Sequence, residues 1–365
     1  MFDGAATRVP VRTTTCHRPA RPLACTHRRT SYVPRVMPTM VESTTSPRSA
    51  MAQPGPQTEV PIAGGVVPPL CTPLTPEREL DVPSLEKLTG HLLGAGVHGL
   101  FVTGSTGEVG YLPDSTRHRV LEVVAGVSAG QVPVLAGVID TATPRVVEQA
   151  RAARRHGADA LVATAPFYVP THPAEIAVHF RRIRAAVDLP LLAYDIPVSV
   201  GTKLAAETVA ELAADGTLAG LKDSSDDLDG IRTVLETVDT DRFLVFSGSE
   251  TMADTGLRLG AHGLVPGLGN VDPDGYLRLH RAATAGDWAL AESEQVRLRG
   301  LFHLIKVGMR RPMSRYSSAI GAFKEALVAR GVIEHGTTSV PMIPLDEAER
   351  AEVRRFLVEA ALLPE

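Results

Sequence analysis

Long apolar runs, cysteines and lysines are scarce in this chain of 365 residues. No apolar run reaches the roughly 18–20 residues that a membrane-spanning helix needs, which argues against an integral membrane protein. Three scattered cysteines without a Cys-x-x-Cys pair predict neither a disulfide framework nor a cysteine zinc site. Only five of the 37 basic residues are lysines, so a lysine inside an apolar segment is an unusual position here.

The charge is unevenly distributed along the chain. The first 57 residues hold eight arginines, no lysine and two acidic residues, a net charge of +6, so the rest carries −10 of the total of −4. A nucleic-acid surface needs clustered positive charge, and an acidic body argues against one. With 44% hydrophobic residues, the composition fits a globular enzyme that acts on small molecules.

Residues 1–57 are rich in Arg, Ser, Thr and Pro and poor in long apolar side chains, so we expect a disordered leader. Three interpretations stay open for it: a mis-assigned start, with Met51 as the true one, a transit peptide, or a binding tail. No apolar core typical of a signal peptide follows the first basic residues, and we expect a cytoplasmic protein.

From residue 60 onward, short apolar runs alternate with longer amphipathic ones. Eight strands alternating with helices predict parallel pairing and favour a (β/α)₈ TIM barrel, an α/β fold, over 58–273. The purely helical pattern after it predicts a small C-terminal helical appendage over 274–365. The predicted strands are 65–72, 99–103, 133–138, 160–164, 189–195, 218–223, 243–247 and 263–266, and the clearest helices are 82–95, 114–129, 144–157, 173–186 and 205–215.

Catalysis in such a barrel takes place at the carboxyl ends of the strands. The second strand ends in the sequence GSTGE at 104–108, where two glycines flank Ser105 and Thr106. Exposed backbone N–H groups and two hydroxyls would form a cradle for a carboxylate or phosphate, although an ordinary glycine-rich turn is the alternative.

Lys222 is the most unusual strand-end residue, because it follows the apolar run 218–221. Period-2 alternation puts it on the face of Gly220, which is plausible as the barrel interior, and a buried lysine amine loses hydration and becomes a nucleophile. The alternative is a lysine that reaches water or pairs with Asp223 or Asp226. Tyr194 ends the fifth strand, where it could exchange protons or only fill the barrel.

Three motifs together carry a family resemblance: 104–108, Tyr194 with the following Asp-Ile-Pro, and the Gly-Leu-Lys-Asp run that holds Lys222. In this order on strands two, five and six, they resemble the class I pyruvate-dependent aldolases, which include dihydrodipicolinate synthase and N-acetylneuraminate lyase. The resemblance extends from about Val60 to about Leu362.

The resemblance implies that Lys222 forms a Schiff base with pyruvate or a related 2-oxo acid, and that Tyr194 is the proton donor and acceptor. It implies that Tyr168 reaches the neighbouring subunit's site as a proton relay, in a dimer or a dimer of dimers. No metal or organic cofactor is implied, and no nucleic-acid or membrane partner is expected. The implied substrate-binding residues are Gly104, Ser105, Thr106 and Val265.

The segment after Tyr194 departs from dihydrodipicolinate synthases, because 197–202 contains no arginine to grip an acidic acceptor. We therefore predict reversible aldol cleavage or condensation of a 2-oxo sugar acid. Within the same machinery, 4-hydroxy-tetrahydrodipicolinate synthase and a Schiff-base dehydratase are the alternatives. A non-catalytic 2-oxo-acid-binding barrel and an unrelated phosphate-binding barrel, using the glycines at 267–269, are the rivals from other classes. Asp195 replaces a common asparagine, and alternation points it away from Tyr194.

Overall fold

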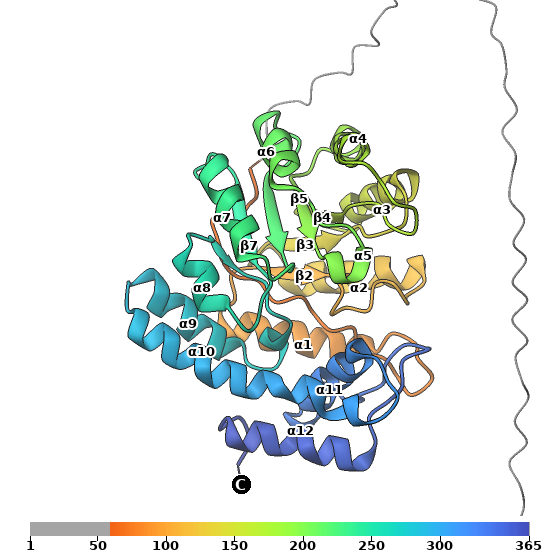
Figure 1. Ribbon diagram of the computed structural model, residues 1–365. Helices are drawn as coiled ribbons and strands as arrows, with labels where there is room; N and C mark the ends of the chain where they lie inside the picture. Colours follow the sequence, from red (N-terminus) through yellow and green to blue (C-terminus); the bar gives the residue numbers. More distant parts are fainter. Residues whose placement is uncertain (1–58, 365) are drawn as a thin grey trace, which may run out of the picture. The chain divides into compact units, whose positions relative to one another are not determined.

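Eight parallel strands form the centre of the fold (Figure 1). The computed structural model of the chain describes residues 59–364, so the predicted leader at 1–57 lies outside the described residues. Every strand falls inside the segment predicted for it. The strands are β1 (Gly65–Val66), β2 (Leu100–Val102), β3 (Val134–Gly137), β4 (Ala160–Thr164), β5 (Leu191–Asp195), β6 (Gly220–Asp223), β7 (Leu244–Ser247) and β8 (Gly263–Leu264).

The strands follow one another in the order β1-β8-β7-β6-β5-β4-β3-β2, and backbone hydrogen bonds link the two ends of this sheet. The N–H of Leu70 donates to the carbonyl of Phe101 at 2.8 Å, and the N–H of Phe101 donates to Pro68 at 3.0 Å. β1 is shorter than predicted because Pro68 and Pro69 have no N–H to donate. The predicted (β/α)₈ barrel is confirmed.

Helices separate the strands and continue to the end of the described chain. The five helices given by the sequence correspond to α1, α2, α3, α4 and α6. The helices are α1 (Val82–Ala95), α2 (Asp114–Ser128), α3 (Thr143–Arg155), α4 (Pro173–Ala186), α5 (Pro197–Val200), α6 (Ala206–Ala214), α7 (Leu228–Thr237), α8 (Ala253–Arg258), α9 (Pro273–Thr284), α10 (Trp288–Phe302), α11 (Arg315–Ala329) and α12 (Glu347–Glu359), with 3₁₀ segments η1 (Gly267–Asn270) and η2 (His303–Arg310).

The short helix α5 follows β5 directly and was not predicted. Proline supplies its first residue, Pro197, with a φ angle suited to a helix start. Gly201 ends it after one turn in the left-handed region, with φ +71°. This turn brings 197–200 to the carboxyl end of the barrel.

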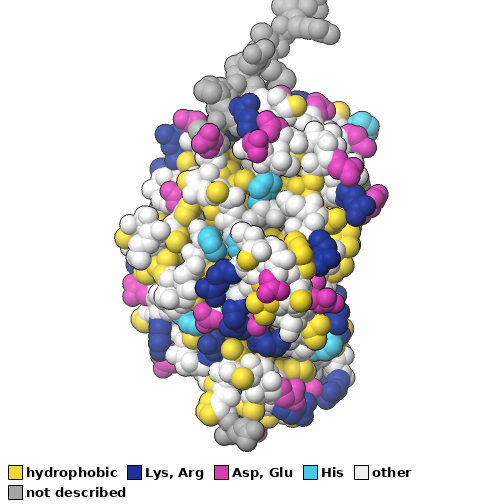
Figure 2. All heavy atoms as spheres, turned by 90° about the vertical axis from the view of Figure 1, so that its left-hand side faces the viewer, with side chains coloured by type: hydrophobic (Ala, Val, Ile, Leu, Met, Phe, Trp, Pro, Cys, Tyr) yellow, Lys and Arg dark blue, Asp and Glu magenta, His cyan; other side chains and the backbone are white. Residues whose placement is uncertain are grey.

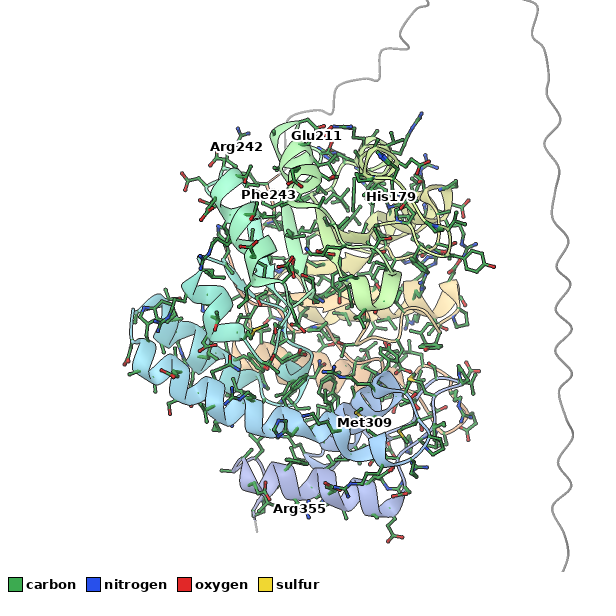
Figure 3. The ribbon with its side chains drawn as sticks, viewed as in Figure 1. His179, Glu211, Arg242, Phe243, Met309 and Arg355 are labelled. Atoms are coloured by element: carbon green, nitrogen blue, oxygen red, sulfur yellow. The ribbon has the colours of Figure 1, made fainter. Side chains whose placement is uncertain are left out.

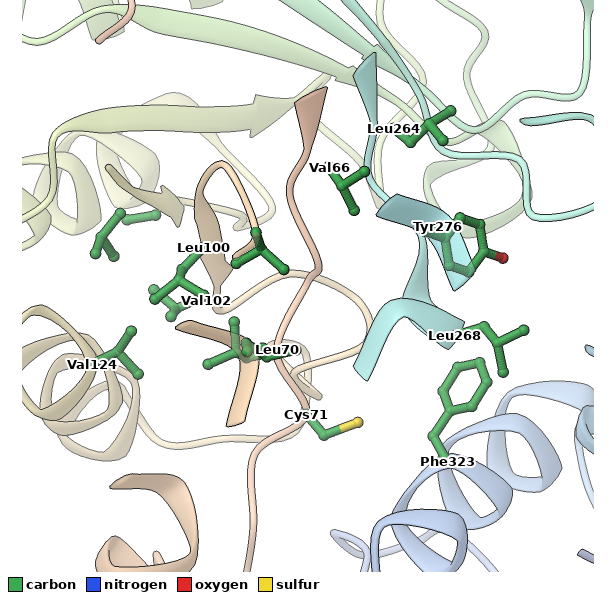
Figure 4. Close-up of a cluster of buried hydrophobic side chains, with 14 of the residues drawn as sticks. Val66, Leu70, Cys71, Leu100, Val102, Val124, Leu264, Leu268, Tyr276 and Phe323 are labelled. Carbon is green, nitrogen blue, oxygen red and sulfur yellow. The ribbon is translucent and has the colours of Figure 1, made fainter. Parts of the chain in front are cut away.

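The apolar core has two layers, which alternate along each strand. In β5, Leu192 and Tyr194 pack inside the barrel with Phe246, whereas Leu191 and Ala193 pack outward against the helices. Figure 4 shows part of the outer layer, where Phe323 of α11 points toward Leu268 in η1. The C-terminal helices therefore share the outer core of the barrel.

Buried polar groups also connect the barrel to its helices. His179 of α4, labelled in Figure 3, lies 2.9 Å from the hydroxyl of Thr143 and 3.2 Å from the carbonyl of Thr164. Burial lowers the pKa of His179 to about 4, so the ring is neutral near pH 7. It joins α3, α4 and β4 without introducing a charge.

The surface is mixed in charge. Figure 2 shows basic and acidic side chains interspersed on the face where α8, α9 and α10 lie. Within residues 59–364, none of the helices has the length and apolar character that crossing a membrane requires.

Candidate active site

A cavity of about 770 Å³ opens at the carboxyl ends of the strands. Its walls come from the segments after β2, β4, β5, β6, β7 and β8, and from one side of α11. This volume lies within the range of small-molecule sites and leaves room beyond a three-carbon acid. The predicted residues that line it are Ser105, Thr106, Tyr194, Lys222 and Val265.

Lys222 lies near the end of β6 with only 4% of its surface exposed. Its Nζ is 4.0 Å from the ring centroid of Tyr194 and 4.8 Å from that of Phe101. Among the described residues, Nζ has no hydrogen bond and no ion pair with Asp223 or Asp226. The amine therefore faces the cavity, and the alternative of a Lys222 ion pair is not what the structure shows.

The parallel register of β5 and β6 sets Tyr194 directly opposite Lys222. The hydroxyl of Tyr194 is 3.4 Å from Ser105 Oγ, so three predicted residues converge at one point of the cavity. A phenol, a hydroxyl and an amine at this spacing can pass protons to a molecule bound between them.

We call residues 103–108 the clamp loop. Its backbone turns sharply, with positive φ at Thr103 (52°) and Glu108 (61°). The Thr103 hydroxyl donates to the Gly137 carbonyl at 3.0 Å. A Cβ on Gly137 would lie 2.2 Å from the backbone carbonyl oxygen of Thr103, so glycine permits this close approach. Within the described chain, the N–H groups of Ser105 and Thr106 have no hydrogen-bond partner. They remain available for an anionic ligand.

Two C-terminal contacts hold the clamp loop from behind. Glu108 forms an ion pair with Lys324 of α11, and both side chains are fully buried. The second carboxylate oxygen of Glu108 accepts the N–H of Ser339 at 2.7 Å, and Lys324 also donates to the carbonyl of Thr337 at 2.6 Å. Each partner of this buried pair is thus held by a second polar contact.

Tyr316 of α11 forms the second contact, because its hydroxyl donates to the carbonyl of Ser105. Burial raises the pKa of Tyr316, so the hydroxyl stays protonated and remains a donor. Its ring also lies 5.8 Å from that of Tyr111 at the cavity wall. Tyr316 therefore fixes the peptide next to the predicted carboxylate-binding groups.

Glu250 follows β7 and lines the same cavity as Lys222. Its Oε1 accepts the N–H of Gly267 at 2.9 Å, which ties the segment after β7 to the segment after β8. Burial raises the pKa of Glu250, and the positive charge of Lys222 opposes that shift. A Cβ on Gly267 would lie 3.0 Å from Glu250 Oε1 and 3.2 Å from Thr106 Oγ1, so glycine leaves room for these two side chains.

The strand residues that follow Tyr194 and Lys222 are acidic. Asp195 and Asp223 are paired in register, and each is at most 2% exposed. Lys203 forms an ion pair with Asp195 and lies 3.7 Å from Asp223 and 3.9 Å from Asp227. Asp195 points away from Tyr194, as predicted, and Lys203 supplies the positive charge between the two strands.

Two predicted residues do not line the cavity. A Cβ on Gly104 would contact the Phe101 ring at 2.6 Å, so this glycine permits close packing beneath the clamp loop. Tyr168 is 92% exposed, with φ +79°. A relay role for Tyr168 stays a prediction that needs a second copy of the chain.

Sequence reasoning missed four residues of this site. The four residues, Lys203, Glu250, Arg315 and Tyr316, were not singled out. The rarity of lysine could have drawn attention to Lys203. Arg315 and Tyr316 come from α11, and no local pattern places that helix over the clamp loop.

A cavity at the carboxyl end of an eight-stranded barrel, with an unpaired lysine, a tyrosine and an anion cradle, defines a small-molecule enzyme site. Comparisons with known proteins identify the family within this class. The sequence profile described as the Dihydrodipicolinate synthetase family matches residues 63–360. The chain belongs to this family, whose members are lyases of the class I aldolase type.

Individual relatives agree with the family assignment. An uncharacterized DapA-like lyase of Halobacterium salinarum is 35% identical over 300 residues, covering 82% of this chain and 94% of the relative. A 4-hydroxy-tetrahydrodipicolinate synthase of Acidobacterium capsulatum is 34% identical over 298 residues, covering 81% and 95%. The predicted enzyme class is thereby confirmed, and the non-catalytic and phosphate-barrel rivals are not supported.

Among solved structures, the chain is similar to YagE from E. coli K12, a protein of the dihydrodipicolinic acid synthase family solved in complex with pyruvate. The TM-score is 0.77 at 28% identity, covering 82% of this chain and 99% of that one. Dihydrodipicolinate synthase from Bacteroides thetaiotaomicron also gives 0.77, at 30% identity, covering 83% and 100%.

Proposed function

We propose that this lyase forms a Schiff base between Lys222 and pyruvate or a related 2-oxo acid. The observation that supports this most directly is the Lys222 amine, which is buried, unpaired among the described residues and adjacent to Tyr194. A lysine freed from ion pairs in a dry site is available for attack on a ketone. The similarity to YagE, a protein solved with pyruvate, adds support.

In this mechanism the Lys222 nitrogen attacks C2 of the 2-oxo acid. The ketone oxygen takes up protons and leaves as water, which gives an iminium that withdraws electrons from C3. Loss of a C3 proton, or cleavage of the C3–C4 bond, forms the enamine. The enamine adds to an aldehyde carbon or is protonated, and water then hydrolyses the iminium to regenerate the amine.

Tyr194 and the clamp loop are the proposed partners in these steps. Tyr194 transfers protons to and from the departing oxygen and the aldehyde oxygen, with Ser105 Oγ at 3.4 Å as its neighbour. The free N–H groups of Ser105 and Thr106 bind the substrate carboxylate. Tyr168 extends the relay from a second subunit, in a dimer or dimer of dimers.

For the substrate we propose a 2-oxo sugar acid, cleaved or condensed reversibly. On the outer wall, which is formed by the segments after β5, β6 and β7, five hydroxyl side chains can hydrogen-bond a polyol. The alternative is 4-hydroxy-tetrahydrodipicolinate synthase, which is the printed name of several relatives. A dehydratase that uses the same iminium is the third candidate. The cytoplasmic location of the protein stays a prediction. The outer-wall hydroxyls are Ser199, Ser224, Ser225, Ser249 and Thr251.

Reductive trapping tests the proposed chemistry. Borohydride reduces an iminium to a stable secondary amine, so pyruvate plus borohydride should add mass to the peptide that contains Lys222. The matched control is Lys203→Arg, which should still be trapped, whereas Lys222→Arg should not. A folded protein that gains no adduct, or gains one on another lysine, would show that the proposal is wrong.

A further inference from the structure

Arg315 is the first residue of α11 and lines the active-site cavity. Among the lining residues, the only other cation is Lys222, whose charge belongs to the reacting amine. Lys203, the nearest basic residue after α5, is already paired with Asp195. The cavity therefore holds one guanidinium that the proposed chemistry does not use.

The arginines just before α11 are engaged, and Arg315 is not. Arg310 pairs with Glu352 at 3.1 Å, and Arg311 pairs with Glu349 at 2.6 Å, so α12 neutralises both. The exposed side chain of Arg315 has no ion pair or hydrogen bond anywhere in residues 59–364. A guanidinium without a partner at a cavity wall presents its donors to whatever occupies the cavity.

The adjacent residue fixes where α11 begins. Tyr316 donates to the carbonyl of Ser105, so the start of α11 is anchored to the clamp loop. Ser314 accepts the N–H of Ser317 at 3.0 Å and caps the helix. The Arg315 side chain is therefore not needed to cap α11. The helix thus holds the Arg315 backbone firmly while its side chain stays available.

The segment after β5 offers no competing positive charge. The segment 197–202, after β5, contains no basic residue, and its exposed Val198 and Ser199 line the cavity. The acidic residues of the lining, Asp226 and Glu250, would repel an anion that approached without a cation to receive it. Arg315 is thus the group in the described lining that can receive a second anion.

We propose that Arg315 binds a second anionic group, a carboxylate or a phosphate, at the far end of the substrate. This inference rests on the proposed function and narrows it to substrates that carry an anion at each end. One anion binds at the clamp loop, the ketone reacts with Lys222, and the other anion forms paired hydrogen bonds with the guanidinium. The class includes sugar diacids, phosphorylated sugar acids and acidic aldehydes.

The carboxylate arm of the test compares 2-oxo acids of equal chain length. 2-Oxoglutarate is matched with 2-oxopentanoate, and 2-oxoadipate with 2-oxohexanoate, because each pair differs only in the terminal carboxylate. The measured quantity is the concentration that gives half-maximal borohydride trapping on Lys222, with pyruvate as the reference. We expect at least one diacid to be trapped at about 10- to 100-fold lower concentration than its partner.

The phosphate arm measures pyruvate consumption with D-glyceraldehyde 3-phosphate against D-glyceraldehyde. In each arm that shows a preference for the anionic over the neutral compound, Arg315→Gln should abolish that preference. Arg315→Lys should keep part of the preference. Arg310→Gln is the matched control and should keep all of it. Pyruvate trapping should be equal in all variants, which separates this test from the test of Lys222.

Three results would overturn the inference. They are equal trapping and turnover of anionic and neutral partners in both arms, a preference that survives in Arg315→Gln, or the same loss in Arg310→Gln. If pyruvate itself is not trapped, the proposed function fails and the inference fails with it.

Discussion

At the scale of single residues, Lys203 compensates the charge of two buried acids that follow Tyr194 and Lys222. Asp195 and Asp223 are in register on β5 and β6, immediately after Tyr194 and Lys222. Burial raises the pKa of Asp223, Asp195 raises it further, and Lys203 lowers it. Removing Lys203 would leave like charges side by side on the two strands that hold Tyr194 and Lys222.

We expect Lys203→Met to destabilise the fold by about 1–3 kcal/mol at pH 8, less than for a fully buried pair because Lys203 is partly exposed. When the pKa of a carboxyl is raised in the folded state, the folded protein loses stability as the pH rises through that pKa and the carboxyl ionises. The effect should therefore be smaller at pH 5 than at pH 8. Urea unfolding at both pH values measures it.

Two variants control for other effects of removing a lysine. Lys87→Met removes an exposed lysine of α1 and should cost little at either pH. Asp195→Asn combined with Lys203→Met should regain stability, since one of the two uncompensated charges is gone. A pH-independent loss, or no recovery in the double variant, would contradict the role given to Lys203.

At the scale of elements, α11 is both a wall of the cavity and an anchor for the clamp loop. We expect Lys324→Met to cost about 3–5 kcal/mol, because Glu108 would remain buried without its partner. The concentration of pyruvate for half-maximal trapping should rise as well, since the loop that binds the carboxylate loses its support. Thermal unfolding and the trapping assay measure the two effects.

Two variants control for other effects of removing Lys324. Lys306→Met removes an exposed lysine of η2 and should leave both measurements unchanged. Adding Glu108→Gln to Lys324→Met should regain part of the stability, because the buried charge is removed. Equal behaviour of Lys324→Met and Lys306→Met would show that the buried pair does not support the loop.

Local patterns made much of this site predictable. Strand alternation placed Lys222 inside the barrel, and the rule on strand ends placed Ser105, Thr106 and Tyr194 at the catalytic end. The contributions of α11 follow no such pattern, since Tyr316 lies 211 residues from its partner Ser105. Sequence periodicity specifies which face of an element is buried, but not which distant helix covers a given loop.

At the scale of the whole molecule, the loop around Tyr168 presents exposed apolar side chains. Tyr168 is 92% exposed and Val169 64% exposed, between the prolines at 166 and 170. We expect Val169→Asp to lower the molar mass seen in sedimentation equilibrium, because a charge would disrupt an apolar contact between subunits. Trapping on Lys222 should survive, whereas kcat should fall if Tyr168 of a partner completes the proton relay.

The matched control for this surface is Val296→Asp on α10, since Val296 is 55% exposed in the described chain. It should leave the mass unchanged if the contact is made by the loop at 165–170. A chain that is monomeric before substitution, or a mass that Val169→Asp does not alter, would rule out this interface.

The anchoring of the clamp loop has a consequence for the order of synthesis. The ribosome completes Ser105, Tyr194 and Lys222 well before it reaches Tyr316 and Lys324, and Ser339 follows 231 residues after its partner Glu108. A nascent chain thus contains the proposed reacting groups before it contains the residues that anchor the clamp loop. The clamp loop therefore gains these anchors only after the residues of all eight barrel strands have been synthesised.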